Sequence, residues 1–357
     1  MNLNTHIKAE TINGKEGHIG LLTLNRPEAL NALSLSMIQV IDNYIHAWEL
    51  DDRIKAIVIR GAGEKAFCAG GDIKQVYIEN QANNPHINRF FWHEYRLNHH
   101  IHNCSKPYIA LMDGITMGGG VGISAHGAHR IGTERLVFAM PETKIGFFPD
   151  VGSSYFLPRC PNSIGYYLGL TGARLKAHDA HYLHLVDHIV PSDRLDDIVQ
   201  ALADTSLDRH NGHAMIAQCI TSFSTIPEAS SLDDLKTEIN HCFSASTITS
   251  VIDRLQQMDN EWSNTTLQEL ESRSPTSLVV TLKQLQEGKR LDFDHCMKME
   301  YRLANRFLKG HDFFEGVRAV IIDKDNQPHW KPQHINEVSN TMVDRYFEPL
   351  EEDLRFN

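Results

Sequence analysis

The sequence predicts an α/β fold in which strands and helices alternate through the N-terminal half and helices alone follow. Short apolar runs rich in Ile, Val, Leu and Ala have the length of buried strands. Glycine-bearing turns follow two of these runs, and after about residue 191 the pattern becomes helical. Repeated strand, turn and helix units are joined by right-handed crossovers, so a wound α/β core is expected.

The first elements can be assigned in chain order. Residues 18–24 form an apolar run that predicts a strand. Residues 34–50 predict a helix, because four apolar residues recur on one face and Ser34 can cap the first turn. Those four residues are Ile38, Ile41, Ile45 and Trp48, and further strands are expected at residues 56–60, 108–112, 129–134 and 136–139.

The remainder of the chain is expected to be mainly helical, with charged stretches at residues 230–240 and 251–271. We therefore expect two domains, an α/β core over residues 1–200 that carries the site and a mainly helical region over residues 201–357. With 357 residues and 41% hydrophobic content, the chain is long enough to bury a sizeable core.

Two glycine-bearing segments are the most informative motifs. AFCAGGD (residues 66–72) and GITMGGGVGIS (residues 114–124) each come soon after a predicted strand. Glycine at such a turn allows the backbone to approach a ligand, and the amides that open a helix have no intrahelical acceptor. Such amides suit a developing oxyanion. A single glycine-rich turn is more often only a tight turn, whereas two matched turns favour a function.

The segment PETKIGFFPDVGSSYFLPR (residues 141–159) carries two acids, Glu142 and Asp150, among apolar residues, prolines and glycines. A carboxylate in apolar surroundings can have its pKa tuned for proton transfer or nucleophilic attack. Either acid alone could instead be structural, because Asp caps turns and Glu is common at helix starts.

Together these motifs resemble the crotonase superfamily, whose members process acyl-CoA thioesters. The resemblance runs from about Gly17 to about Pro332 and implies a spiral of ββα repeats. It implies that the amides of Gly71 and Gly119 hold the thioester carbonyl oxygen. Each such donor is worth about 3 kcal/mol in the transition state.

The residues PET, FPDVG, YFLPR and GITMGGGVGIS resemble a thioesterase branch of the superfamily that hydrolyses 3-hydroxyisobutyryl-CoA in valine breakdown, with 3-hydroxypropionyl-CoA as a second expected substrate. This resemblance implies that Glu142 is the catalytic glutamate and that Asp150 contacts the 3-hydroxyl of the substrate. Glu94, in WHEYRLN, corresponds to a further substrate-contacting acid. Glu142 could attack the thioester directly or deprotonate a water, and the sequence leaves both routes open.

The same motifs admit two other functions. Enoyl-CoA hydratases of the superfamily use two glutamates, one of them three residues after the oxyanion glycine, where this chain has Gly122. Glycine has no side chain to hold or deprotonate water, so hydration is the weaker interpretation. A catalytically silent CoA-binding scaffold is the second alternative, and the retention of both oxyanion glycines with Glu142 and Asp150 speaks against it.

No cofactor or metal is expected, since CoA is part of the substrate. Cys68, in the first glycine turn, has no evident base and is not expected to be a nucleophile; the six cysteines read as free thiols. On a helix, several of the histidines near residue 180 share one face, where a metal could bind, but a solvated face is the preferred interpretation. These histidines are His178, His181, His184 and His188, and the cluster His93, His99, His100 and His102 is interpreted in the same way.

The net charge of −11 argues against nucleic acid as a partner. The CoA phosphates need only a few local cations, which Arg26, Lys55, Lys65 or Lys74 could supply. No window is apolar enough to span a membrane, and the first ten residues lack the features of a signal peptide or transit peptide. The expected partner is therefore a small acyl-CoA, the expected compartment is the cytoplasm, and a homo-oligomer remains open.

Overall fold

The computed structural model describes residues 6–15, 17–207 and 212–356. These residues form two compact units, each assembled from distant parts of the sequence. The first unit comprises Met1–Gly71, Arg96–Phe138 and Leu175–Ser230, and the second comprises Asp72–Tyr95, Ala139–Arg174 and Ser231–Asn357. The domain boundary expected near residue 200 was based on composition along the chain, and it stays a prediction.

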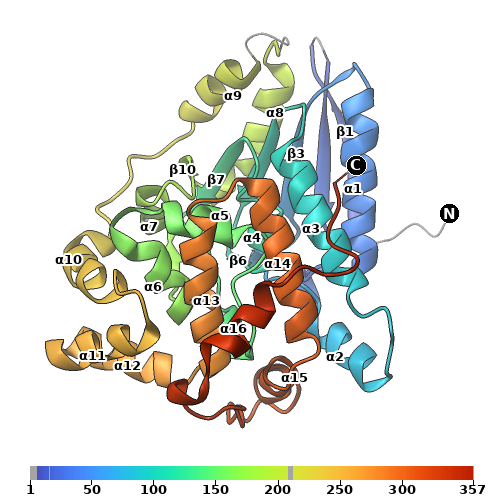
Figure 1. Ribbon diagram of the computed structural model, residues 1–357. Helices are drawn as coiled ribbons and strands as arrows, with labels where there is room; N and C mark the ends of the chain where they lie inside the picture. The colour runs from blue at the N-terminus through green and yellow to red at the C-terminus, as the bar shows by residue number, and fades with distance from the viewer. Residues whose placement is uncertain (1–5, 16, 208–211, 357) are drawn as a thin grey trace. The chain divides into compact units, whose positions relative to one another are not determined.

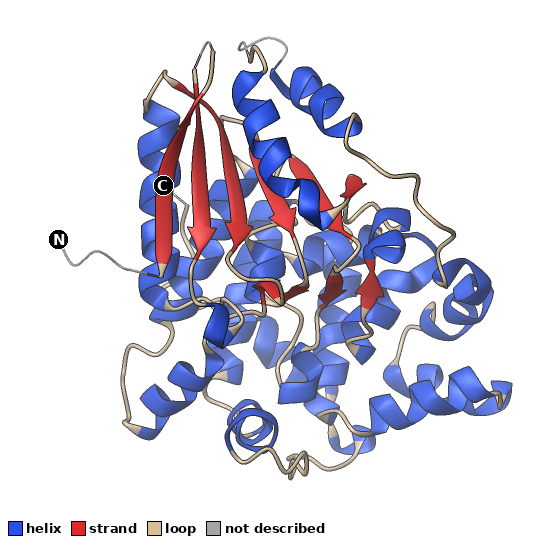
Figure 2. Cartoon of the chain, turned by 180° about the vertical axis from the view of Figure 1, so that it is seen from behind, coloured by secondary structure: helices blue, strands red, loops and turns tan. Residues whose placement is uncertain are grey.

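The first unit is built around a six-stranded sheet with the order β1-β2-β3-β5-β7-β10 (Figure 2). Strand β1 is antiparallel to β2, and the other neighbours are parallel, as crossovers through helices require. A four-stranded sheet has the order β4-β6-β8-β9. The strands are β1 (Ile7–Asn13), β2 (His18–Leu24), β3 (Ile54–Gly61), β4 (Ala66–Cys68), β5 (Tyr108–Met112), β6 (Ile115–Met117), β7 (His129–Thr133), β8 (Val137–Ala139), β9 (Leu175–Lys176) and β10 (His188–Val190).

Helices cover both faces of the six-stranded sheet because its strands are apolar on both sides. On one face, Ile19, Leu21 and Val58 pack with buried residues of α8 (Leu195–Asp204) and α9 (Gly212–Thr221). On the other face lies α1 (Leu35–Leu50), since a Cβ at Gly20 would lie 2.5 Å from the Trp48 ring. Glycine at that position in β2 therefore allows the helix to pack closely.

Most predicted elements of the first unit are confirmed. The strand at 18–24 and the strand at 108–112 have the predicted bounds. The predicted helix is α1, capped by the Ser34 side chain, which accepts a 3.3 Å hydrogen bond from the Met37 amide. The four apolar residues of its predicted inner face are buried. The sequence did not predict strands β1, β4, β6, β9 and β10; all five have seven residues or fewer, and four of them have three or fewer.

The second unit is helical, as the sequence predicts for the C-terminal part. Figure 1 shows α13, α14 and α16 grouped together, and α16 contacts both of the others. Side-chain caps begin several helices; Ser274 Oγ accepts from the Ser277 amide at the start of α13. Helix α3 (Arg89–His102) continues from the second unit into the first. The principal helices of the second unit are α2 (Ile73–Gln81), α5 (Ser153–Phe156), α6 (Ile164–Thr171), α10 (Leu232–Phe243), α11 (Ile248–Met258), α12 (Glu261–Glu271), α13 (Pro275–Gly288), α14 (Phe293–Phe307), α15 (Asp312–Val317) and α16 (Asn340–Phe347).

Candidate active site

The second glycine turn of the first unit opens a short helix directly after a strand. Strand β6 ends at Met117, Gly118 has φ +51°, and α4 runs over Gly119–Gly122. The amides of Val121 and Gly122 both donate to the Gly118 carbonyl, so bonding within the turn begins at Val121. The amide of Gly119 therefore belongs to the helix start, where donors are available to a ligand.

The two glycine turns lie against each other in the first unit. A Cβ at Gly120 would lie 2.2 Å from the Cys68 carbonyl oxygen, and one at Gly70 would lie 3.8 Å from the Gly119 nitrogen. Gly70 has φ +118°, a backbone conformation that favours glycine. The structure thus brings the turn that contains Gly71 next to the turn that contains Gly119, as two donors to one oxygen require.

The predicted acids gather in the second unit, on three segments. Glu94 lies on α3, Glu142 begins the 3-10 helix η2 (Glu142–Ile145), and Asp150 lies in the turn before α5. All three are buried, with 2%, 8% and 5% of their surface exposed. Buried carboxyls without a cation are costly, so a cluster of this kind marks a functional site rather than a stabilising one.

Burial and mutual repulsion raise the pKa values of these acids. Burial is the larger cause for Glu94, whose pKa is also raised by the charges of Asp150 and Glu142. The pKa of Glu142 rises well above its ordinary value for the same reasons. Burial raises the pKa of Asp150 to about 7, although a hydrogen bond from Tyr95 opposes the rise. The cluster therefore holds protons near neutral pH, where it could exchange them with a substrate.

Two carboxyl oxygens in this cluster are buried without a partner. Oε1 of Glu94 and Oε2 of Glu142 are buried and have no hydrogen-bond partner among the residues that the structure describes. Buried polar atoms are nearly always paired in folded proteins. Unpaired oxygens on both of these residues are consistent with their predicted contacts to substrate.

Sequence reasoning missed two residues of the cluster, Tyr95 and Glu300. The Tyr95 hydroxyl donates a 2.7 Å hydrogen bond to Asp150 Oδ2. Glu300, on α14, is fully buried and accepts hydrogen bonds from the amides of Gly152 and Ser154. Tyr95 adjoins Glu94 in sequence and could have been found from that neighbour. Glu300 lies in an amphipathic helix with no local motif to single it out.

An aromatic cluster fixes the segment between the two acids. Phe147 and Phe148 have ring centroids 4.5 Å apart, and Phe147 lies 5.4 Å from Phe91 on α3. Phe147 also lies 5.4 Å from Phe307 on α14 and 4.8 Å from Phe313 on α15. Aromatic pairs at these separations add to the gain from burial. The FFPD motif is therefore anchored on three helices of the second unit.

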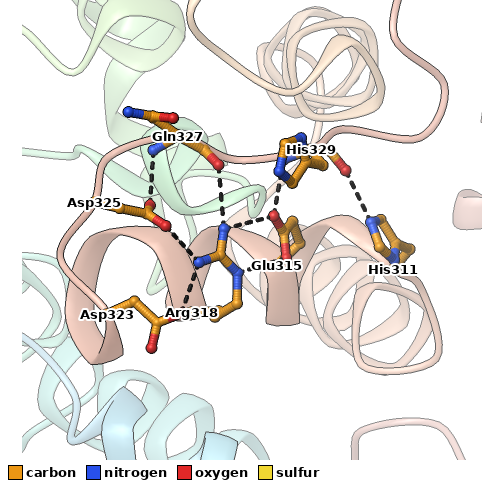
Figure 3. Close-up of polar contacts among 7 residues, drawn as sticks. All are labelled: His311, Glu315, Arg318, Asp323, Asp325, Gln327 and His329. Atoms are coloured by element: carbon orange, nitrogen blue, oxygen red, sulfur yellow. Dashed lines mark hydrogen bonds and ion pairs between the residues drawn. The ribbon is translucent and has the colours of Figure 1, made fainter.

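A C-terminal clasp, residues 323–331, closes against η2. The Arg318 guanidinium donates to Glu315, Asp323 and Asp325 (Figure 3). Its two parallel bonds to Glu315 are both 2.9 Å long. Glu315 also accepts from the His329 amide. The adjacent Trp330 ring packs against Gly146, where a Cβ would lie 2.9 Å from the ring. The clasp thereby covers the end of the helix that begins with Glu142.

The expected histidine helix does not form. Helix α7 covers only Ala177–Tyr182, His184 has φ +57° in the turn that follows, and His188 begins β10. The helical spacing of the four histidines was therefore a wrong prediction, because a left-handed turn interrupts it. Across residues 6–15, 17–207 and 212–356, no group of three or more His, Cys, Asp or Glu side chains is arranged to hold a metal.

The remaining candidates show ordinary structural roles. Cys68 is buried with its thiol 3.6 Å from the Gly70 carbonyl, and the six cysteines are free thiols. Arg26 donates to the Ala32 carbonyl and Lys55 to the Asp52 carbonyl. None of the helices in the described part of the chain combines the length and the apolar character needed to cross a membrane.

An α/β core with paired glycine turns and a separate cluster of buried acids defines the class of acyl-CoA enzymes with the crotonase fold. The chain belongs to the enoyl-CoA hydratase/isomerase family, whose model matches residues 19–347. It is 45% identical over 353 residues to "3-hydroxyisobutyryl-CoA hydrolase, mitochondrial" of Gallus gallus, covering 97% of this chain and 91% of the relative. The relative of the same name from Homo sapiens is 43% identical, covering 100% and 93%.

Two solved structures share the fold over nearly the full length. A carnitinyl-CoA dehydratase from Mycobacterium thermoresistibile is 37% identical, with a TM-score of 0.90 and 99% of both chains covered. An enoyl-CoA hydratase from Rhodobacter sphaeroides 2.4.1 is 35% identical, with a TM-score of 0.86, covering 98% of this chain and 99% of that one. The predicted crotonase fold and its C-terminal helical region are confirmed.

Proposed function

We propose that this chain hydrolyses 3-hydroxyisobutyryl-CoA to the free hydroxy acid and CoA. The observation that carries the proposal is the buried acid cluster, in which Glu142 keeps one unpaired oxygen and Asp150 is held beside Tyr95. The full-length relatives with the hydrolase name support the same activity at 43–45% identity. Gly122 argues against the competing hydratase activity, because glycine supplies no second base for hydration.

In the proposed reaction, the amides of Gly71 and Gly119 hold the thioester carbonyl oxygen and stabilise the negative charge that develops on it. Glu142 acts in one of two ways. Its carboxylate attacks the carbonyl carbon and expels the CoA thiolate, and water then hydrolyses the mixed anhydride. Alternatively, Glu142 takes a proton from the water that attacks the carbonyl directly.

Asp150 supplies the preference for 3-hydroxyacyl groups. Its carboxylate accepts a hydrogen bond from the 3-hydroxyl, while Glu94 provides a further polar contact to the acyl group. A buried acceptor that loses its partner is costly, so an acyl group without the hydroxyl is processed poorly. 3-Hydroxypropionyl-CoA keeps that hydroxyl and is the second proposed substrate.

The activity places the chain in valine breakdown and requires no cofactor beyond the CoA of the substrate. We keep the cytoplasm as the proposed compartment, although the vertebrate relatives carry the word mitochondrial in their names. A homo-oligomer is also a proposal. Nucleic acid and membranes are not proposed as partners, in view of the net charge of −11.

Dehydration or hydration of an acyl-CoA is the second candidate, because the two solved relatives at 37% and 35% identity carry those activities in their titles. That chemistry needs an acid or base to move a proton on the carbon chain as well as to handle water. Glu142 alone could serve one of these roles, and position 122 could not serve the other.

The test follows free thiol from 3-hydroxyisobutyryl-CoA and, in parallel, the conjugated absorbance of crotonyl-CoA. We expect thiol release from the first substrate and no absorbance loss with the second. Absorbance loss without thiol release would overturn the proposal in favour of hydration. Binding of CoA with no turnover of any hydroxyacyl-CoA would overturn it in favour of a silent scaffold.

A further inference from the structure

Glu300 accepts hydrogen bonds from the turn that carries Asp150. Its Oε2 accepts a 2.7 Å hydrogen bond from the Gly152 amide, and its Oε1 accepts a 3.0 Å bond from the Ser154 amide. The Ser154 hydroxyl makes a further short contact with Oε1. The side chain of Glu300 is fully buried, so both oxygens are committed to this one turn.

The turn has an unfavourable backbone conformation, which the hydrogen bonds to Glu300 stabilise. Val151 has φ +52° and Gly152 has φ +90°. A β-branched residue in the left-handed region is a strained exception, which persists only where the surroundings impose it. From the opposite side, Gln284 donates a 2.6 Å hydrogen bond to the Pro149 carbonyl. The conformation at Asp150 is therefore imposed by α13 and α14 together.

A carboxylate suits this role better than an amide. Backbone N–H groups can only donate, and the two amides approach different oxygens of Glu300. A glutamine would place its NH₂ group against one of the two amides and lose that bond. When Glu300 is ionised, its hydrogen bonds are also stronger than those to a neutral acceptor.

We propose that Glu300 is a positioning residue for Asp150, which makes it a determinant of the preference for 3-hydroxyacyl groups. The proposal rests on the proposed function, because it assigns to Asp150 the contact with the substrate hydroxyl. Glu300 itself touches the turn and not the substrate. Its action is to hold Val151 and Gly152 in the conformation that presents the Asp150 carboxyl.

The charge of Glu300 also reaches the neighbouring acids. The titratable groups that face it are Asp150 and Glu142 on the turn segments, Tyr95 on α3 and Cys296 on its own helix. Burial, then the charge of Asp150, and then that of Glu300 raise the pKa of Glu142. Burial raises the pKa of Glu300 itself to about 8, so it is mostly protonated at neutral pH and its charge acts on Glu142 mainly in the alkaline range.

The test compares the wild type with Glu300→Gln on 3-hydroxyisobutyryl-CoA and on isobutyryl-CoA, which lacks the hydroxyl. We expect the ratio of kcat/KM for the two substrates to fall at least ten-fold in Glu300→Gln. Equal loss on both substrates would show a general structural role and overturn the proposal.

The matched control is Asp179→Asn. Asp179 is another buried carboxylate that accepts from a serine hydroxyl, that of Ser230, and from a backbone amide, that of Lys176. It lies on α7 of the first unit, outside the acid cluster. We expect Asp179→Asn to lower stability without changing the substrate ratio. A similar change of the ratio in Asp179→Asn would also contradict a specific role for Glu300.

Two further measurements separate this inference from the proposed function. Glu300→Asp keeps the carboxyl group but shortens the reach, so the substrate ratio should fall; an unchanged ratio overturns the proposal. Hydrogen exchange at the amides of Gly152 and Ser154 measures their hydrogen bonds to Glu300 directly and requires no turnover. Protection of those amides should drop in both Glu300 variants, and unchanged protection overturns the proposal even if the wild type proves inactive.

Discussion

The Tyr95 hydroxyl and the Asp150 carboxyl are joined by a 2.7 Å hydrogen bond, and both residues are buried. The phenol donates, so the bond favours the ionised form of Asp150 against the effect of burial. The pKa of Asp150, raised to about 7, is therefore a balance between apolar surroundings and one donor. By lowering the pKa of Asp150, Tyr95 widens the pH range over which the ionised carboxylate can accept a hydrogen bond.

Tyr95→Phe should raise the KM for 3-hydroxyisobutyryl-CoA roughly ten-fold at pH 7.5, because one hydrogen bond to a charged group is lost. Without the donor, the pKa of Asp150 rises further, so the acceptor is protonated over a wider pH range. Steady-state kinetics between pH 6 and 9 measure the effect. Tyr301→Phe, which removes a neighbouring hydroxyl that accepts from Asn88, is the control. Equal KM values for Tyr95→Phe and wild type would contradict the role of Tyr95.

Glu142→Gln should reduce thiol release by roughly 10²–10⁴-fold, the range for a lost acid or base. The same change should stabilise the fold at alkaline pH. A carboxyl whose folded pKa is raised loses stability as pH rises from its ordinary value through the folded one, and glutamine does not ionise. We expect a gain of at least about 1 kcal/mol at pH 8 relative to pH 5 in urea unfolding. Glu64→Gln, at an exposed position, should change neither quantity.

The pH profile of the wild type should have its acidic limb well above pH 4.5, the ordinary pKa of a glutamic acid. Glu142 acts only when ionised, and its pKa lies well above the ordinary value because of burial and the neighbouring acids. Activity should therefore already fall at pH values well above 4.5. Initial rates of kcat/KM between pH 4.5 and 9 measure the limb, with stability checked at each pH. A limb near pH 4.5 would mean that the acid cluster is solvated in solution.

Gly120→Ala should slow turnover by roughly 10²–10³-fold, the cost of losing one oxyanion donor. The added Cβ would lie 2.2 Å from the Cys68 carbonyl and must push α4 away from β4. Gly212→Ala is the matched control, because a Cβ there meets nothing within 4 Å and alanine favours the helix. Thiol release and thermal unfolding are measured for both. Normal turnover in Gly120→Ala would argue against an oxyanion role for this turn.

Arg318→Ala should lower the melting temperature and expose the C-terminal clasp to proteolysis near residues 323–331. Arg318→Lys should have a smaller effect, since lysine keeps the charge but cannot make the two parallel bonds to Glu315. The difference from wild type should shrink in 1 M salt, where the screening length is only about 3 Å. Lys309→Ala, an exposed cation on the same unit, is the control. Equal protease sensitivity in all variants would mean that Arg318 does not hold the clasp.

The sequence predicted those parts of the fold and site whose signals are local. The apolar face of residues 34–50 and its Ser34 cap are read within one segment, and both are confirmed. The glycine turns and the two acids between residues 141 and 159 stand in compact motifs. Their roles follow from chemistry that each motif carries by itself.

The parts that escaped prediction depend on contacts between distant segments. Glu300 and Gly152 are 148 residues apart in the sequence. No local pattern around either residue predicts their contact. The left-handed conformation of Val151 could not be foreseen either, because valine seldom adopts it and only the surrounding helices impose it. The histidine prediction failed at His184, where the same kind of turn ends a helix that periodicity would continue.

The link between Gly152 and Glu300 also affects how the protein is made. During synthesis at about 5–20 residues per second, the Asp150 turn leaves the ribosome roughly 7–30 s before the helix that supports it. Through that interval a strained turn and several acids lack the partners that bury them. A messenger cut short before codon 300 would thus encode a chain with every sequence motif of the site and without the means to hold Asp150 in place.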